Sequence, residues 1–283
     1  MVDVYRPASL SEALKIRNER STELLAGGTD LMVHYKNWAG LDPKFPKPVL
    51  FLDNVAELRT IESVGSEICV GAGCSLSQIL ADPHVPKIVK EGIDTIAAPA
   101  LKNRATMMGN VCNGSPAGDS IPPLMVLNAR IRLESSERKR ELSVDEFITG
   151  PGQTQLQENE IATAILIPEN SCNISYFRKV GTRKANALTK LSLAGLANVE
   201  GGNVQDIRLA FGAVAPIVVR SIGLESEIVG TPLAQLDIEK IVEKYAPLIR
   251  PIDDQRSKAK YRKTVSLNLL RFFLSHTIRE SPC

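Results

Sequence analysis

The stretch LLAGGTDL, residues 24–31, places two adjacent glycines between a short apolar run and an amphipathic run. The apolar spacing that predicts a helix after the glycines is formed by Leu31, Met32, Tyr35 and Trp38. Because Gly27 and Gly28 carry no side chains, backbone amides at this turn can contact a ligand directly. The stretch therefore predicts a strand, a ligand-binding turn and a helix.

A second unusual segment, NRATMMGNVCNGSPAGDSIPP, covers residues 103–123 and carries three Gly, three Pro and three Asn. Long irregular segments inside compact domains are more often functional than idle. Two glycine-rich turns can bind the two halves of a pyrophosphate through backbone amides, without Lys or Arg. Asp119 can then accept a ribose hydroxyl. Apolar residues suited to line a flat ring are Leu24, Leu25, Met107 and Met108. The alternative is that both segments are only tight turns.

Composition excludes several classes of protein. The chain has 283 residues, 43% hydrophobic and 23% charged, which is ordinary for a soluble protein with a proper core. A formal charge of +2 gives no reason to expect nucleic acid or a membrane surface as a partner. No apolar run approaches the roughly 20 residues of a membrane span, and MVDVYRPASLSEAL lacks the apolar stretch of a signal peptide. We therefore expect a cytoplasmic protein.

The common catalytic and metal-binding motifs are missing from the sequence. It contains no G-x-G-x-x-G fingerprint, no Walker A sequence and no G-x-S-x-G elbow. The five cysteines are scattered without a C-x-x-C pair, so we expect plain reduced thiols and no metal ligands. The three histidines, His34, His84 and His276, lack metal-ligand spacing. We predict no catalytic residue and no metal site in this chain.

The order of predicted elements indicates an α+β fold in two parts. A capping box at Ser9 and Glu12 predicts a helix from about residue 10 to 18. Strands and helices then alternate as far as Pro168, with a tight turn at Gly65 between two strands and a polar stretch between the strand candidates ARIRLES and NEIATAILIP. Three consecutive strands follow, the last two joined by a hairpin at Gly201, and then three helices. The boundary is predicted near residues 168–174.

Several of these stretches together resemble the FAD-binding subunit of the molybdenum hydroxylases, the family of xanthine dehydrogenase and carbon monoxide dehydrogenase medium subunits. Residues 26–31 match the family's first flavin loop, A-G-G-x-[ST/D]-L, and 103–110 match R-N-R-[AG]-T-I-G-G-N. Residues 115–119 match the S-P-x-[AS]-D that follows. Further matching stretches are 159–168, 177–183, 211–220 and 261–263. Met108 departs from the pattern, since it replaces the first glycine of G-G-N.

The resemblance implies a fold and a set of site residues. The fold is a FAD-binding domain of the vanillyl-alcohol-oxidase or p-cresol-methylhydroxylase type at 1–170, with two α+β subdomains at about 1–55 and 56–170. A smaller α+β domain of the carbon monoxide dehydrogenase flavoprotein type, a three-stranded sheet with helices, follows at 171–283. The implied cofactor-binding residues are Leu24, Leu25, Ala26, Gly27, Gly28, Thr29, Asp30, Leu31, Thr106, Met107, Met108, Gly109, Asn110, Ser115, Asp119, Thr163 and Lys179.

The resemblance also implies an electron-transfer role. FAD in this chain would take electrons from two [2Fe–2S] clusters of a small partner and pass them to NAD⁺ or another acceptor. A large partner would hold the molybdenum cofactor and oxidise a purine, another N-heterocycle, an aldehyde or a similar small molecule. Two alternatives stay open: a stand-alone FAD reductase of the same fold, and a regulatory or assembly protein without flavin.

Overall fold

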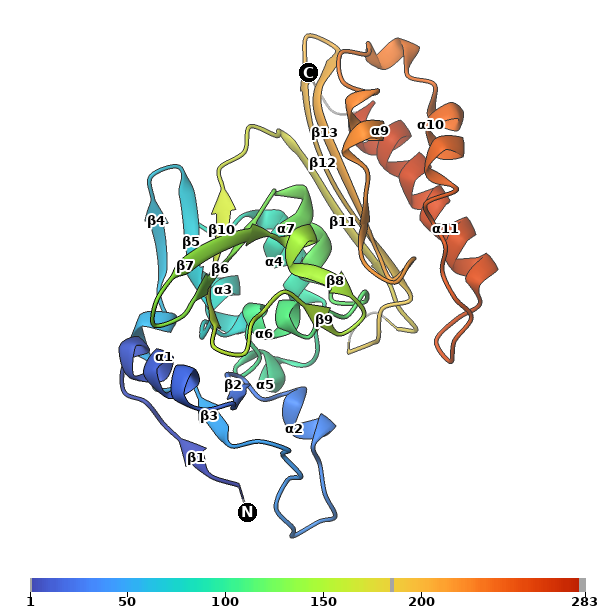
Figure 1. Cartoon of the computed structure of the whole chain (residues 1–283). Helices are drawn as coiled ribbons and strands as arrows, with labels where there is room; N and C mark the ends of the chain where they lie inside the picture. The colour runs from blue at the N-terminus through green and yellow to red at the C-terminus, as the bar shows by residue number, and fades with distance from the viewer. Residues whose placement is uncertain (1, 184–185, 280–283) are drawn as a thin grey trace.

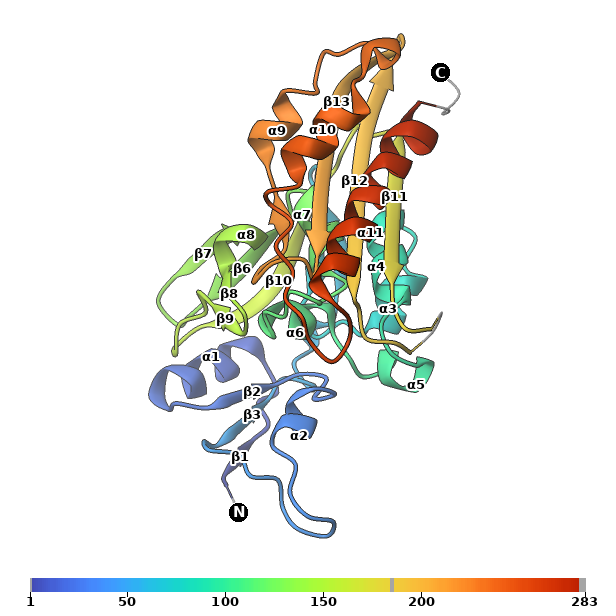
Figure 2. The ribbon, with the colours of Figure 1, turned by 90° about the vertical axis from the view of Figure 1, so that its right-hand side faces the viewer.

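The computed structural model describes residues 2–183 and 186–279, and three sheets organise them (Figure 1). The first sheet is parallel, in the order β1-β3-β2, and lies at the bottom of Figures 1 and 2 with two short helices beside it. Its elements are β1 (Val4–Tyr5), α1 (Leu10–Glu19), β2 (Glu23–Leu25), α2 (Leu31–His34) and β3 (Val49–Phe51).

The second sheet is antiparallel, with the order β4-β5-β10-β6-β7. Its strands are β4 (Ile61–Val64), β5 (Glu67–Gly71), β6 (Arg130–Glu134), β7 (Lys139–Ser143) and β10 (Ile161–Pro168). The segments between these strands form η1 (Ala56–Leu58), α3 (Leu76–Ala81), α4 (Lys87–Asp94), α5 (Pro99–Lys102), α6 (Met107–Cys112), α7 (Ile121–Val126), α8 (Val144–Phe147), and a small hairpin of β8 (Ile148–Gly150) and β9 (Gln153–Thr154).

The third sheet has four strands in the order β11-β12-β13-β14, where the sequence predicted three. The added strand, β14, is only two residues long, too short to give a periodic signal. Strands and helices of this part are β11 (Ile174–Val180), β12 (Leu191–Glu200), β13 (Asn203–Gly212), β14 (Val219–Arg220), α9 (Ile222–Ser226), η2 (Leu233–Gln235), α10 (Ile238–Tyr245), α11 (Ala259–Phe272) and η3 (Phe273–Ile278), which continues α11.

Helices cover both faces of the third sheet. Helices α9, α10 and α11 lie on its outer face, and α4 and α7 lie between it and the second sheet (Figures 1 and 2). Strand β12 is accordingly apolar along both faces: Leu193 and Ala197 belong to the core with α10 and α11, and Ala194 and Leu196 belong to the core of the N-terminal part. This double burial fixes the C-terminal part against the rest of the chain.

Most of the predicted elements agree with the structure. Helix α1 begins after the N-cap Ser9, whose side chain accepts the Glu12 N–H, as the capping box requires. Hairpins β4–β5 and β12–β13 turn at Gly65 and Gly201, both with positive φ. The three C-terminal helices are present within the described residues.

The helix predicted after residues 24–31 is much shorter than its apolar spacing indicates. Helix α2 ends at His34, and the Lys44 N–H donates to the Tyr35 carbonyl, so the chain folds back as a loop. Trp38 is 80% exposed and forms no part of a buried stripe. Periodicity failed here because the backbone leaves the helical conformation at Tyr35 and Asn37 Oδ1 accepts the Trp38 N–H, a local bond that competes with a helix.

Candidate functional site

A cavity of about 820 Å³ lies where the N-terminal sheet, the second sheet and the C-terminal strands meet. All of the predicted site residues except Met107 and Thr163 line it. These cavity-lining residues are Leu24, Leu25, Ala26, Gly27, Gly28, Thr29, Asp30, Leu31, Thr106, Met108, Gly109, Asn110, Ser115, Asp119 and Lys179. Segments that are far apart in the chain therefore form one site of the size expected for a large cofactor.

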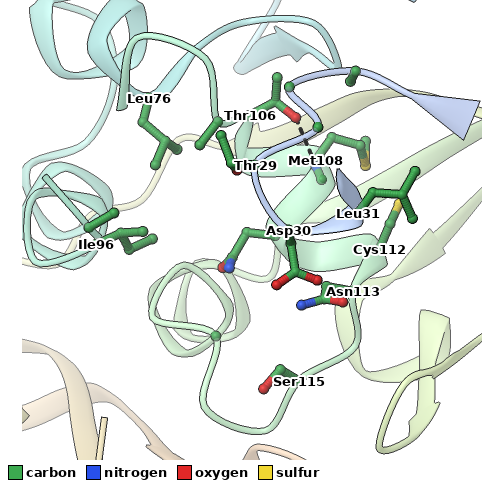
Figure 3. Close-up of a pocket in the computed structure, with 18 of the residues that line it drawn as sticks. Thr29, Asp30, Leu31, Leu76, Ile96, Thr106, Met108, Cys112, Asn113 and Ser115 are labelled. Atoms are coloured by element: carbon green, nitrogen blue, oxygen red, sulfur yellow. Dashed lines mark hydrogen bonds between the residues drawn. The ribbon is translucent and has the colours of Figure 1, made fainter. Parts of the chain in front are cut away.

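The first loop, residues 26–30, follows strand β2 and precedes helix α2 (Figure 3). Gly28 has φ +70°, a left-handed conformation that costs a side chain roughly 1–2 kcal/mol and suits glycine. Its carbonyl accepts the Met32 N–H and starts the helical turn. Residues 26–30 all line the cavity, and at Gly27 and Gly28 no side chain covers the backbone there.

The two glycine-bearing segments are packed against each other. A Cβ atom on Gly27 would lie 2.1 Å from the Arg104 carbonyl oxygen and 2.9 Å from the Ala105 Cα. Such distances are far below van der Waals contact with backbone atoms that cannot move aside. Gly27 is therefore required for the close approach of the two segments, and not only for a turn.

The second segment is held by local hydrogen bonds. Thr106 is the N-cap of α6, and its Oγ1 accepts the Gly109 N–H at 3.0 Å (Figure 3). Asn110 Oδ1 accepts a hydrogen bond from Ser120 Oγ at 2.6 Å. Met108, at the position of the missing glycine, is 5% exposed and points its thioether into the same region as Leu31 and Cys112. The methionine thus forms part of the cavity wall.

Asp119 is the centre of a buried polar network. Its Oδ2 lies 2.7 Å from Lys179 Nζ, and its Oδ1 accepts a hydrogen bond from Thr189 Oγ1 at 2.6 Å. Lys179 also donates to the Thr95 carbonyl at 3.0 Å. Burial raises the pKa of Asp119, and the ion pair with Lys179 and the hydrogen bond from Thr189 act against that rise. Each carboxylate oxygen keeps a further lone pair for a ligand hydroxyl.

Two predicted residues lie outside the cavity. Met107 is 1% exposed and packs in the core. Thr163 sits at a bulge in β10, where the register against β6 shifts between Ala162 and Ala164. Its hydroxyl donates to Glu134 Oε1 at 2.7 Å and its carbonyl accepts the Ala72 N–H. Neither residue is part of the cavity wall, and contact of either one with a cofactor stays a prediction.

Sequence reasoning missed other parts of the wall. For Arg17 the sequence held one signal of burial. It lies four residues after Ala13, on the same face of the helix, and these two are the buried residues of α1. The others are small or apolar and give no chemical signal. The cavity-lining residues not predicted include Arg17, Thr22, Leu52, Ala72, Leu76, Ile96, Ala97, Leu101, Cys112, Asn113, Leu156, Ile161, Ala162, Leu188, Thr189 and Arg256.

The cysteines offer no nucleophile at this site. Cys112 lines the cavity, and burial raises its pKa to about 12, so it stays a thiol at neutral pH. Cys69, Cys74 and Cys172 are also free thiols, and Cys283 lies outside the described residues. In residues 2–183 and 186–279 we find no group of three or more His, Cys, Asp or Glu side chains arranged to hold a metal ion. Among those residues no helix is long and apolar enough to cross a membrane.

Comparison with known families gives two matches that follow each other along the chain. Residues 1–170 match the FAD binding domain in molybdopterin dehydrogenase. Residues 175–277 match the CO dehydrogenase flavoprotein C-terminal domain.

Relatives and solved structures match over nearly the whole length. The chain is 28% identical to a xanthine dehydrogenase FAD-binding subunit of Escherichia coli O157:H7, covering 98% of this chain and 94% of the relative. It is 25% identical to the carbon monoxide dehydrogenase medium chain of Hydrogenophaga pseudoflava, covering 95% and 94%. A chain of reconstituted CO dehydrogenase from Oligotropha carboxidovorans has a TM-score of 0.90 at 22% identity, covering 100% and 99%.

Proposed function

The chain belongs to the family of FAD-binding subunits of the molybdenum hydroxylases, of the xanthine and carbon monoxide dehydrogenase type, and from this premise we propose that the cavity described above binds its FAD. The family assigns the chain to oxidoreductases and makes FAD its cofactor. We add three proposals: which residues contact the FAD, which molecule accepts the electrons, and which substrate the whole enzyme oxidises.

The observation that carries the proposal is the packing of the two glycine-bearing segments around one cavity. The Gly27 contact with Arg104 leaves no room for a side chain, and Gly28 requires a left-handed conformation. Together they place the backbone of residues 26–30 beside the N-terminal turn of α6 in one cavity wall. A pyrophosphate fits such a donor set because backbone amides can solvate it without basic side chains.

The residues around this centre have separate tasks. The two segments fix the pyrophosphate, and Asp119 keeps a lone pair for a hydroxyl while Lys179 and Thr189 hold its carboxylate in place. Met108, Leu31 and Ile96 supply apolar surface that excludes water from a flat ring. FAD, when bound, supplies the electron-transfer chemistry, and the protein supplies position and electrostatics. The chain itself needs no acid or base for this role.

We propose the partners from the names of the relatives. Relatives are called medium chains, as in carbon monoxide dehydrogenase, which implies larger and smaller subunits. The partners would be a large subunit with the molybdenum cofactor and a small subunit with two [2Fe–2S] clusters. Electrons would pass from the clusters to FAD and then to an acceptor such as NAD⁺. The substrate of the assembly would be a purine, another N-heterocycle, an aldehyde or a similar small molecule, and a cytoplasmic location stays a prediction.

We also propose the division of the chain made from the sequence, with a FAD-binding domain at 1–170 in two subdomains and a C-terminal domain at 171–283. The first and second sheets provide the two halves of the first domain. The large cavity lies at their junction and is closed by Lys179 of β11, residues 186–189 and Arg256. This arrangement places the cofactor where all three units contribute walls.

The experiment that tests the electron-transfer role follows the flavin bands of the FAD-loaded assembly. Reduced FAD is mixed separately with NAD⁺, a quinone and oxygen, and reoxidation is timed by stopped flow. Reoxidation by NAD⁺ within the turnover time of the assembly supports the proposed acceptor. If NAD⁺ reoxidises the flavin slowly and a quinone or oxygen does so fast, the acceptor is that compound and not NAD⁺. Turnover of a substrate by this chain alone would instead favour the stand-alone reductase.

A further inference from the structure

Arg17 is a charged side chain buried at the end of the cavity. It is 9% exposed, lies on helix α1 and contributes to the cavity wall. Within residues 2–183 and 186–279 no carboxylate oxygen lies within 4.0 Å of its guanidinium, so it forms no ion pair there. A buried cation without a direct counter-ion is costly, and its retention calls for a reason.

Part of the guanidinium has a structural task. Nε donates to the Glu160 carbonyl at 3.2 Å, and Nη1 donates to the Thr22 carbonyl and, at 3.1 Å, to Thr22 Oγ1. These bonds join the N-terminal sheet to the start of β10. An arginine carries five N–H donors, and three are used in this way. For the Nη2 donors, no acceptor is present among the described residues.

The charges around Arg17 disfavour an anion as its ligand. Burial lowers the pKa of Arg17, and the carboxylates of Glu158 and Glu23 act against that fall from a distance. Lys47 pairs with Glu158 at 3.0 Å, which leaves the surroundings near neutral overall. A phosphate at this point would be repelled by the two carboxylates. A neutral group with hydrogen-bond acceptors suits the place better.

The place of Arg17 along the chain of contacts points the same way. Its partner Thr22 comes just before strand β2, and the glycine loop comes just after that strand, whose extended residues rise about 3.3 Å each. Arg17 therefore contributes to the cavity wall at the start of β2, and the proposed pyrophosphate site lies at its end.

Buried apolar side chains close the cavity wall on the elements that hold Arg17. Leu25 of β2, Leu52, whose N–H donates to the Leu25 carbonyl, and Ile161, which follows Glu160, are between 0% and 4% exposed. Leu188, another lining residue, is 67% exposed, so the cavity opens to the surface there. A redox ring must exchange electrons with other molecules and belongs at the open end. The closed end is suited to a group that only anchors the cofactor.

We propose that Arg17 recognises the adenine of FAD, with its Nη2 donors directed to ring nitrogens of the base and the apolar residues of the closed end packed on the ring. Adenine is neutral and offers N3 and N7 as acceptors, which match guanidinium donors. The inference rests on the proposed FAD site and adds the residue that distinguishes FAD from FMN, which lacks the adenosine.

The test compares FAD and FMN binding in the purified full chain and in the assembled complex. Dissociation constants are measured by flavin fluorescence for wild type, Arg17→Met, Arg17→Lys and the control Lys15→Met, which changes an exposed residue of the same helix. We expect Arg17→Met and Arg17→Lys to weaken FAD binding by about tenfold, since a hydrogen bond from a charged donor is lost. FMN binding should change less than about twofold, and Lys15→Met should change neither.

Since FAD and FMN are compared within one variant, any loss of folded protein lowers both signals equally and cancels in the ratio. Equal weakening of FAD and FMN, or no weakening of either, overturns the adenine assignment and leaves Arg17 as a link between sheets. If FMN is too weak to titrate, competition by ADP replaces it: the inhibition constant of ADP must rise in Arg17→Met and that of inorganic pyrophosphate must not. A wild type that binds no FAD overturns the proposed site itself.

Discussion

Lys179 Nζ lies 2.7 Å from Asp119 Oδ2, and this ion pair joins strand β11 to the segment that begins α7. Both side chains are nearly buried, and both line the cavity. The pair therefore couples the position of strand β11 to the shape of the proposed cofactor site. A substitution of either residue should lower both the stability of the fold and the affinity for the cofactor.

Replacing Lys179 by Met should destabilise the protein by about 3–5 kcal/mol, because Asp119 is left buried without its counter-charge. The double variant Asp119→Asn with Lys179→Met should recover part of that loss, since no charge remains uncompensated. Urea unfolding of the two variants and wild type measures this. Equal stability of the single and double variants would show that the pair does not stabilise the fold.

Gly27→Ala should abolish tight FAD binding. Its Cβ would lie 2.1 Å from the Arg104 carbonyl oxygen, so the two loops must separate. The matched control is Gly223→Ala in α9, where no atom lies within 4 Å of the added Cβ and φ is not positive. The control should bind FAD like wild type and be as stable or more stable, because alanine favours helix. Retained FAD in Gly27→Ala would contradict the packing argument.

Thr163→Val should leave FAD affinity within about twofold of wild type while lowering the free energy of unfolding by about 1–3 kcal/mol. The hydroxyl donates to Glu134 and does not line the cavity, so only a buried hydrogen bond is lost. Flavin titration and urea unfolding on the same sample separate the two effects. A large loss of FAD affinity with unchanged stability would return Thr163 to the cofactor site.

Acid stability should depend on Glu160, whose side chain is fully buried. Burial opposes its ionisation, but hydrogen bonds from Arg140 at 2.7 and 2.8 Å and from the Gln157 N–H at 3.0 Å hold its pKa below the ordinary 4.5. A folded pKa below the unfolded value gives stability that is present above pH 4.5 and is lost as pH falls through the folded pKa.

Thermal unfolding of wild type and Glu160→Gln at several pH values checks this. Wild type should have the higher Tm near neutral pH, and the difference should shrink as pH falls below 4.5. A difference that stays constant with pH would mean that the charge of Glu160 does not contribute.

Much of the site could be predicted because its chemistry depends on residues with strong local signals. Glycines at 27, 28 and 109 stand out in any sequence, and Asp119 follows in a recognisable motif. All of the residues predicted to bind the cofactor, except Met107 and Thr163, line one cavity, and their contact with the cofactor stays a prediction. Thr163 lies at a bulge that shifts the register of β10 against β6, and the alternation of residues along the strand does not predict that bulge.

Other features depend on tertiary contacts that sequence patterns do not contain. Strand β7 was hidden in a polar stretch, because it is a charged edge strand whose Glu141 pairs with Arg130 and Arg132 of β6. The role of Arg17 depends on its hydrogen bond to the carbonyl of Glu160, which is 143 residues away in the sequence. Helix α2 ends at His34 because the chain then folds back as a loop, and the apolar spacing of the sequence does not predict this loop.

The most direct test of the central claim is the visible absorption spectrum of the purified chain, alone and in its assembly, after gel filtration from excess FAD. We predict flavin bands that stay with the wild type at one FAD per chain and are lost in Gly27→Ala but kept in Gly223→Ala. A wild type without flavin bands in both forms, or a Gly27→Ala variant that keeps them, would contradict a FAD site built from the two packed loops.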